Sequence, residues 1–184
     1  GSSDGQGTVA SFNYPASIAI DASNQIYIAD EHNHLIRRID SSGNVSTIAG
    51  SGSVGSSDGQ GTNASFNYPF GIAIDNFGNI FVADRNNQLI RKVNSSGYVT
   101  TVAGQVGEVG SANGQGTSAS FNYPCDVAID SSGNIYVADT SNHLIRKLDP
   151  DGYVTTLAGN VNVGSLDGQG TAATFNEPAG VTVD

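Results

Sequence analysis

The sequence contains no methionine, no tryptophan and a single cysteine, Cys125. One thiol excludes an internal disulfide framework, and a lone cysteine is more often a small buried hydrophobe than a nucleophile. Basic residues are also scarce, because 7 Lys and Arg stand against 17 Asp and Glu, for a formal net charge of -10. This charge repels phosphate backbones and anionic lipid, so we expect no nucleic-acid partner.

Long apolar segments and helical periodicity are missing as well. No stretch approaches the ~18 apolar residues that a membrane helix needs, and no basic region followed by an apolar run indicates a signal sequence. We therefore expect no membrane insertion. The sequence lacks an initiator methionine and begins inside a pattern that returns later, so we expect a piece of a longer protein.

The residues that are abundant form an internal repeat. With 24 Gly and many Ser, Thr and Asn, the composition favours turns and strands. Four prolines are spaced by 54, 55 and 54 residues: Pro15, Pro69, Pro124 and Pro178. The motif Phe-Asn-Tyr-Pro ends at the first three of them, and Phe-Asn-Glu-Pro at the fourth. The repeat units are 1–54, 55–109, 110–163 and a partial 164–184, and such periods indicate a solenoid or a propeller.

The third unit shows what one repeat contains. Short apolar runs predict four strands, at 127–129, 135–138, 143–148 and 154–157. The turns between them have hairpin length, so the strands form an antiparallel meander. The first strand is apolar throughout, as expected for the innermost strand of a propeller blade, which neighbouring blades cover on both faces. A helical solenoid would need helical periodicity, and a β-solenoid would need much shorter coils.

We therefore expect an all-β fold, a β-propeller with three complete four-stranded antiparallel blades and the first strand of a fourth. The repeat resembles the NHL repeat, whose core reads roughly Pro-x-Gly-Ile-Ala-Val-Asp, then Gly-Asn-Ile-Tyr-Val-Ala-Asp, then Asn-x-x-Ile-Arg. The second unit carries these motifs at 69–75, 78–84 and 87–91, with counterparts in the first and third. Known NHL domains commonly have six blades, so the resemblance implies about half of a ring.

Half of a ring leaves two apolar blade faces and unpaired strand edges at its ends, and such surfaces favour association. We expect the ring to be completed by further blades of the same parent chain or by other copies of this chain. A closed pair of half-rings and an open fibre are both compatible with the repeat.

Two families of aspartates recur in every complete unit. The first follows the innermost strand and would surround the channel like a metal collar, but aspartate in Asp-x-x-Gly-Asn is a turn former, which we favour. Its members are Asp21, Asp75, Asp130 and Asp184. The second precedes a repeated asparagine and arginine, and we expect this framework to lock a turn and pair charges. Its members are Asp30, Asp84 and Asp139, with Asn33, Asn87 and Asn142, and with Arg37, Arg91 and Arg146.

A third acidic position lies in the loop Gly-Ser-x-Asp-Gly-Gln-Gly-Thr. It is occupied by Asp4, Asp58, Asn113 and Asp167 in the four units. Several Asp-Gly loops on one face could bind Ca²⁺, but each offers only one carboxylate, whereas a calcium loop supplies several ligands. We therefore expect no cofactor and keep Ca²⁺ as the minor alternative.

The sequence offers no residue that is clearly suited to catalysis. His34 and His143 share one repeat position, which Gln88 occupies in the second unit, and His32 fits a solvated turn residue. No second ligand stands at a spacing typical of metal sites, and Cys125 has no unique partner. Relatives of this fold include lyases and lactonases that use unique residues around the channel, and we find none that departs from the repeat. We therefore expect no metal site and no enzyme.

Three glycosylation sequons begin at Asn44, Asn63 and Asn94. They lie in predicted turns or at strand ends, where glycans would be accessible in a secreted protein. We expect a secreted, extracellular or periplasmic location.

Our first hypothesis is a non-catalytic propeller scaffold that binds a protein or carbohydrate ligand or assembles with itself. Blade-specific residues are confined to turns and loops, where contact surfaces are usually found. The predicted contact residues are Glu31, His32, Arg85, Asn86, Thr140 and Ser141. The alternatives are a fragment of a metal-dependent lyase or lactonase, and a sensor domain of a larger receptor.

Overall fold

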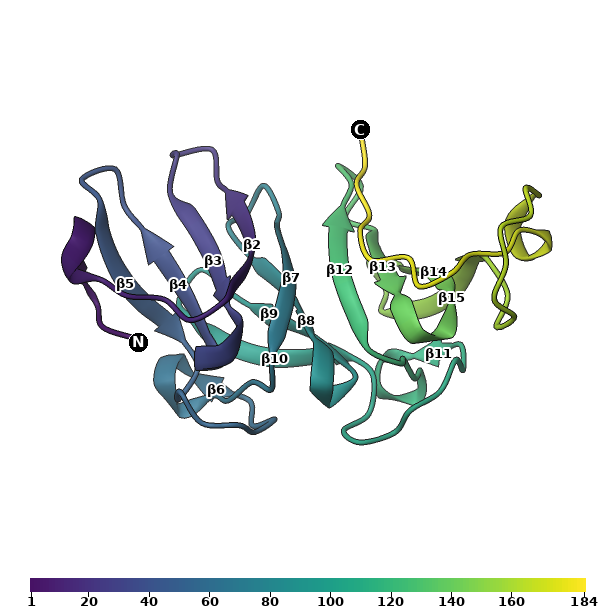
Figure 1. Ribbon diagram of the computed structural model, residues 1–184, viewed down its shortest axis with the longest axis horizontal. Coiled ribbons are helices and arrows are strands. Elements are labelled where there is room, and N and C mark those ends of the chain that lie inside the picture. Colours follow the sequence, from purple (N-terminus) through teal and green to yellow (C-terminus); the bar gives the residue numbers. More distant parts are fainter.

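The computed structural model describes residues 1–184 and consists of three five-stranded antiparallel sheets without an α-helix. In the first sheet, the meander runs from the inner strand to the outer one through β2 (Pro15–Ile20), β3 (Ile26–Asp30), β4 (Leu35–Ile39) and β5 (Asn44–Ala49). The sheets follow one another as blades along an arc (Figure 1). The predicted all-β propeller is therefore confirmed.

The second and third sheets repeat this order. The second contains β7 (Pro69–Ile74), β8 (Ile80–Asp84), β9 (Leu89–Val93) and β10 (Tyr98–Ala103). The third contains β12 (Pro124–Ile129), β13 (Ile135–Asp139), β14 (Leu144–Leu148) and β15 (Tyr153–Ala158). All four predicted strands of the third unit are confirmed, and the innermost begins earlier than expected, at Pro124.

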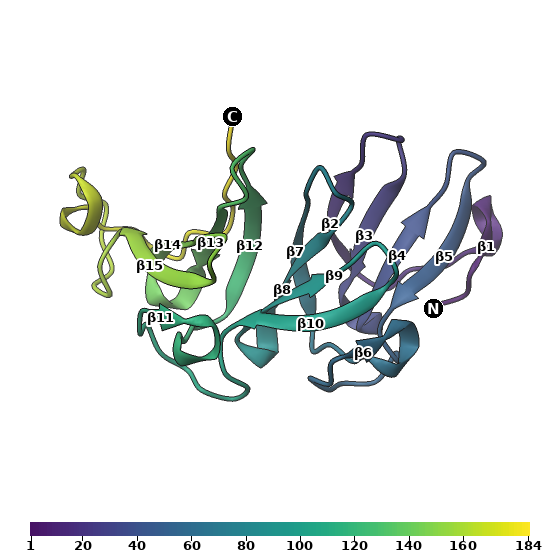
Figure 2. The ribbon, with the colours of Figure 1, turned by 180° about the vertical axis from the view of Figure 1, so that it is seen from behind.

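Each blade also has a fifth strand that the sequence did not reveal. The two-residue strands β1 (Gly5–Gln6), β6 (Gly59–Gln60) and β11 (Gly114–Gln115) pair with the outer strands β5, β10 and β15. Figure 2 shows them at the outer edges of the blades. The long loop between blades thus first runs along the outer edge of the next blade and then crosses to its inner strand. Pairing at the outer edge satisfies backbone groups that would otherwise face solvent.

The core lies between blades. One cluster joins the first two blades and includes Ile36, Phe66 and Val82, all fully buried. A second joins the second and third blades and includes Ile90 and Phe121. The inner strands approach closely, because a Cβ added at Gly71 would lie 2.5 Å from the Cα of Asp126. Glycine at position 71 therefore permits the packing of β7 against β12.

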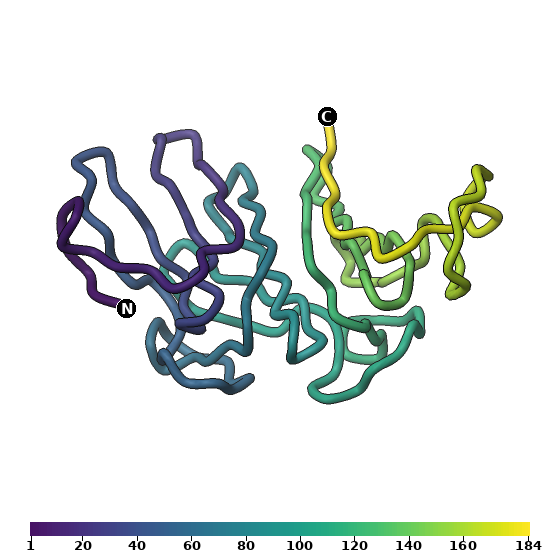
Figure 3. Tube along the Cα trace, viewed as in Figure 1, coloured from purple at the N-terminus to yellow at the C-terminus, as the bar shows by residue number.

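The partial fourth unit lies beside the third blade (Figure 3). Its single 3-10 turn, η7 (Gly170–Ala172), is followed by no strand, so the predicted inner strand at 180–184 does not form. The physical reason is that residues 1–184 hold no second strand of the same blade with which 180–184 could form a ladder. The Val181 N–H instead donates to the Asp126 carboxylate at 3.0 Å. The helical segments are all 3-10 turns of three residues, and none of them could cross a membrane.

Candidate functional site

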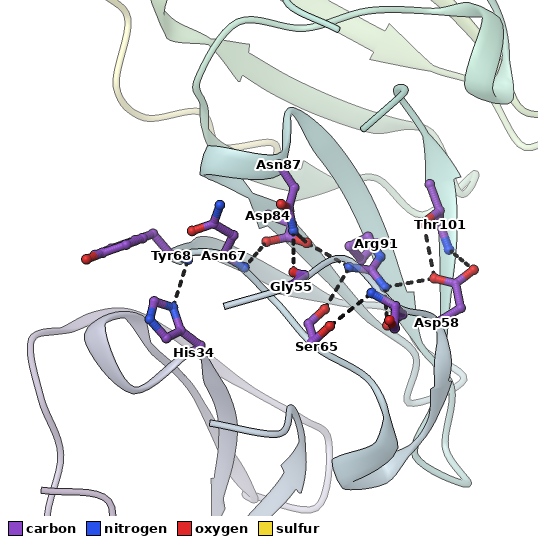
Figure 4. Close-up of polar contacts among 11 residues, drawn as sticks. His34, Gly55, Asp58, Ser65, Asn67, Tyr68, Asp84, Asn87, Arg91 and Thr101 are labelled. Carbon is purple, nitrogen blue, oxygen red and sulfur yellow. Dashed lines mark hydrogen bonds and ion pairs between the residues drawn. The ribbon is translucent and has the colours of Figure 1, made fainter. Parts of the chain in front are cut away.

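A buried arginine organises one end of every blade, as the second blade shows (Figure 4). The Arg91 side chain is fully buried, and its Nη1 lies 2.7 Å from Oδ2 of Asp84, which is also fully buried. The same oxygen accepts a bond from Asn87, and Oδ1 of Asp84 accepts one from the backbone N–H of Asn67. The predicted Asp, Asn and Arg framework is therefore confirmed as a structural lock.

The third acidic position belongs to the same network. Nη2 of Arg91 donates to Oδ1 of Asp58 at 2.8 Å and to the Ser57 carbonyl at 3.0 Å. The Asp58 carboxylate also accepts bonds from the backbone and the hydroxyl of Thr101 on the outer strand. The carboxylate considered for calcium thus ties the loop to its own blade.

The other blades repeat this network. Arg37 bridges Asp30 and Asp4 in the first blade. In the third blade Arg146 pairs with Asp139, and its Nη2 donates to Asn113 Oδ1 at 2.9 Å. An amide oxygen therefore suffices at the loop position, and the arginine framework serves the fold in each copy.

The aspartates after the inner strands hold turns at the opposite end of the blades. Oδ1 of Asp130 accepts the backbone N–H groups of Ser132 and Asn134, and Asp21 and Asp75 do the same in their turns. The hydrogen bond from the Asn134 side chain lowers the pKa of Asp130. The predicted turn-forming role is confirmed for these three.

The predicted contact residues all lie on short 3-10 turns between the second and third strands of the blades: η2 (Glu31–Asn33), η4 (Arg85–Asn87) and η6 (Thr140–Asn142). Some of them already bridge blades. Glu31 is largely buried and lies 3.6 Å from Arg85 of the next blade, and Thr140 donates to the Pro178 carbonyl at 2.8 Å. His32 is exposed, as predicted, and its ring stacks on Tyr14 at 4.4 Å.

A row of tyrosines lies at the same end. Tyr14, Tyr68 and Tyr123 all adopt the left-handed conformation, with φ between 51° and 56°. Tyr14 is 70% exposed and Tyr123 is 41% exposed, and the Arg85 guanidinium lies 5.7 Å from the Tyr123 ring centroid. We call these tyrosines, together with η2, η4 and η6, the tyrosine face.

A latch between blades fixes each tyrosine after the first. Nδ1 of His34 accepts the backbone N–H of Tyr68 at 3.1 Å, and Oε1 of Gln88 accepts that of Tyr123 at 2.6 Å. His143 accepts the corresponding N–H of Glu177 at 3.1 Å. Histidine and glutamine are thus equivalent here because each presents one acceptor to the next blade.

The latch predicts a pH dependence. Burial, aided by the charge of His32, lowers the pKa of His34 below its usual value. The unfolded chain therefore binds the proton more readily, so folding stability is present above about pH 6.5 and falls as the pH drops through the folded pKa. Thermal unfolding between pH 5 and 7.5 measures this effect as the difference between wild type and His34→Gln, which copies Gln88, and we expect the wild type to lose more stability than the variant as the pH falls. An unchanged pH profile in that variant would contradict the latch.

Two further positions are informative. Asp126 lies on the inner strand where the other units have Ser17, Gly71 and Gly180, and burial raises its pKa. This acid is not among the site residues expected from the sequence, although its departure from the repeat could have revealed it. Cys125 is buried, as predicted.

The sequons occupy different environments. Asn44 and Asn63 are exposed, and the Asn44 side chain donates to Asp40. The Asn94 side chain accepts bonds from Ser96 and Tyr98 within its turn, so only Asn63 is free of side-chain bonds.

Comparison of the sequence with known protein families identifies the same repeat units as the structure. The NHL repeat family matches residues 12–39, 66–93 and 121–148, which run from the Phe-Asn-Tyr-Pro motif to the end of the third strand in each blade. The three blades are NHL repeats. NHL repeat-containing protein 2 of Bos taurus is 36% identical over 125 residues, which are 65% of this chain and 17% of that protein. The chain spans less than a fifth of the length of the first two curated relatives that it matches.

Solved structures share the blade architecture. A protein of unknown function from Bacteroides thetaiotaomicron is 26% identical, with a TM-score of 0.76 over 94% of this chain and 42% of that one. A gluconolactonase from Xanthomonas campestris is 14% identical, with a TM-score of 0.59 over 80% of this chain and 48% of that one. At that identity the likeness concerns the fold alone, and it shows that NHL-like propellers share their architecture with enzymes.

Proposed function

We propose that this chain is a non-catalytic, extracytoplasmic binding module whose tyrosine face receives a segment of a partner protein. The observation that carries the proposal is the preorganised aromatic surface. Tyrosine and arginine are among the side chains that most often dominate protein interfaces. The latches hold the backbone of Tyr68 and Tyr123, and the buried Asp30 accepts the N–H of Asn13 beside Tyr14.

Rigid support matters because binding otherwise costs the ordering of each side chain, about 0.5–1.5 kcal/mol for a rotamer-rich group. His32 packs between Tyr14 and Tyr68, with ring centroids at 4.4 and 5.2 Å. Arg85 lies over Phe70 and Tyr123. The recurring Asp, Asn and Arg side chains are, by contrast, engaged in hydrogen bonds within the blades, so the exposed Tyr14, His32 and Tyr123 are left to contact a partner.

The test is selection of peptides on the purified chain from a displayed library of random dodecamers. Selected peptides are expected to lose at least about thirtyfold in affinity for the double variant Tyr14→Asn, Tyr123→Asn, which corresponds to about 2 kcal/mol. Asparagine tolerates the left-handed conformation at both positions, so the backbone is preserved.

The matched control is Tyr98→Asn, which removes an exposed tyrosine from the outer strand β10. Peptides that bind wild type and the double variant equally would overturn the proposal. Failure to select any peptide, with binding on a carbohydrate array instead, would replace the protein ligand with a glycan.

An enzyme is the second candidate, and Asp126 is the observation that favours it. This acid is unique among the units and lies on an inner strand, where the channel wall forms. It ranks second because its carboxylate already accepts the backbone N–H of Val181 and so has a structural partner.

A further inference from the structure

A groove of about 440 Å³ opens between the second and third blades, at the end opposite the tyrosine face. Volumes of 300–1,000 Å³ are typical of small-molecule sites. Both walls are complete blades, and the packing of β7 against β12 places them. The groove therefore exists whatever completes the ring.

Several residues that line this groove depart from the repeat. At four lining positions the other two complete units share one residue and the groove carries a different one: Phe77, Phe81, Pro150 and Asp151. Their counterparts are Ser23 and Ser132, Tyr27 and Tyr136, Ser41 and Ser95, and Ser42 and Ser96. They come from two turns and one strand of two blades, so sequence proximity does not explain why they meet.

Phe77 is the most unusual of the four, because its side chain is 84% exposed. Its backbone N–H donates to Asp75 Oδ1 at 2.9 Å, as that of Ser23 donates to Asp21 in the first blade. The turn therefore needs no aromatic ring at this position. The ring stands free at the groove and offers a face for stacking.

The charge of the groove is strongly negative. Four aspartates line it, and Lys92 is its one cation. Asp75 and Asp130 are engaged by their turns, whereas the Asp149 carboxylate accepts only the Tyr153 N–H and the Asp151 carboxylate has no partner. The Lys92 ammonium lies over the buried Phe81 ring at 5.7 Å. Carboxylate oxygens beside an exposed aromatic ring favour a cation, by charge pairing and by the cation–π attraction.

We propose that this groove binds a small organic cation, an ammonium or guanidinium group joined to an apolar or aromatic body. The body rests on Phe77 and Pro150, and the cationic group pairs with Asp149 and Asp151. This site is separate from the tyrosine face, so it can be tested independently.

The test is calorimetric titration with three probes that share one aromatic body and differ in charge. We expect phenethylammonium to bind at least about tenfold more tightly than 2-phenylethanol, which corresponds to about 1.4 kcal/mol, and 3-phenylpropionate not to bind. The variants Phe77→Ser and Asp151→Ser restore the residues of the other two blades, so they should keep the fold and each weaken phenethylammonium at least about tenfold.

The matched control is Tyr14→Asn at the opposite end, which should leave phenethylammonium binding unchanged. Equal binding of the alcohol and the ammonium would overturn the proposal. So would absence of phenethylammonium binding at millimolar concentration, or full binding by both serine variants.

Discussion

Replacement of Arg91 by methionine is expected to lower the free energy of unfolding by about 3–5 kcal/mol, because the variant leaves Asp84 buried without its ion-pair partner. Arg91 also donates to Asp58 and to the Ser57 and Ser65 carbonyls, so the loop of the second blade loses its attachment at the same time. Urea unfolding followed by circular dichroism at pH 7 measures the loss.

The pH dependence of that loss has a definite sign. Burial raises the pKa of Asp84 to about 6, and the Arg91 charge is the main influence that opposes burial. Without Arg91 the folded pKa rises further above its unfolded value. The carboxyl then contributes stability that is lost as the pH rises through the folded pKa. The destabilisation of Arg91→Met should therefore be smaller at pH 5 than at pH 8.

Arg85→Met serves as the matched control. Arg85 is one-third exposed and lies 3.6 Å from Glu31, and pairs of this kind contribute at most about 1 kcal/mol. If Arg91→Met costs no more than Arg85→Met, the buried network does not support the blade. Adding Asp84→Asn to Arg91→Met removes the stranded charge and should recover part of the loss.

The strands of each blade could be predicted because their signals are local. The apolar run 135–138, followed by Asp139 and a short turn, predicts a strand and a hairpin within ten residues. The repeat shows that pattern three times. The pairing of Asp84 with Arg91 was predictable for the same reason, since seven positions separate them.

The contacts that the sequence did not reveal cross long distances in the chain. Asp58 and Arg91 are 33 positions apart, and their contact depends on the path of the loop along the outer edge of the blade. The latch joins His34 to Tyr68 in the next blade. The presence of Gln88 at the same repeat position correctly indicated that imidazole is not required, but only the structure shows that a hydrogen-bond acceptor is.

Residues that depart from the repeat indicate candidate binding sites that the repeated residues do not. Phe77 and Pro150 have no acid–base, nucleophilic or metal-binding group, so the sequence alone does not single them out. Their role in a binding site becomes visible only in the structure, where the packing of two blades brings them to one groove. Asp126 was overlooked because the repeat position is otherwise small, as Gly71 and Ser17 show.

The two end faces of the arc expose apolar side chains that neighbouring blades bury elsewhere in the structure. Ile18 and Ile20 on β2 are 61% and 58% exposed, whereas Ile72, the counterpart of Ile18 in the second blade, is 5% exposed because the first blade covers it. At the other end Leu157 is 46% exposed, while its counterpart Val102 packs against the core between blades. We propose that these two faces meet in association of this chain with other copies, as further blades would meet them within a ring.

The double variant Ile18→Thr, Ile20→Thr is therefore expected to weaken self-association about a hundredfold or more. Burial of each isoleucine is worth about 1.5–3 kcal/mol, and each 1.4 kcal/mol is a factor of ten. Threonine retains the β-branched shape that suits a strand. Analytical ultracentrifugation over a concentration series measures the change, with Val106→Thr as the control, because Val106 is exposed in a loop away from both end faces. A wild-type chain that sediments as a compact monomer at every concentration would show that the end faces do not associate.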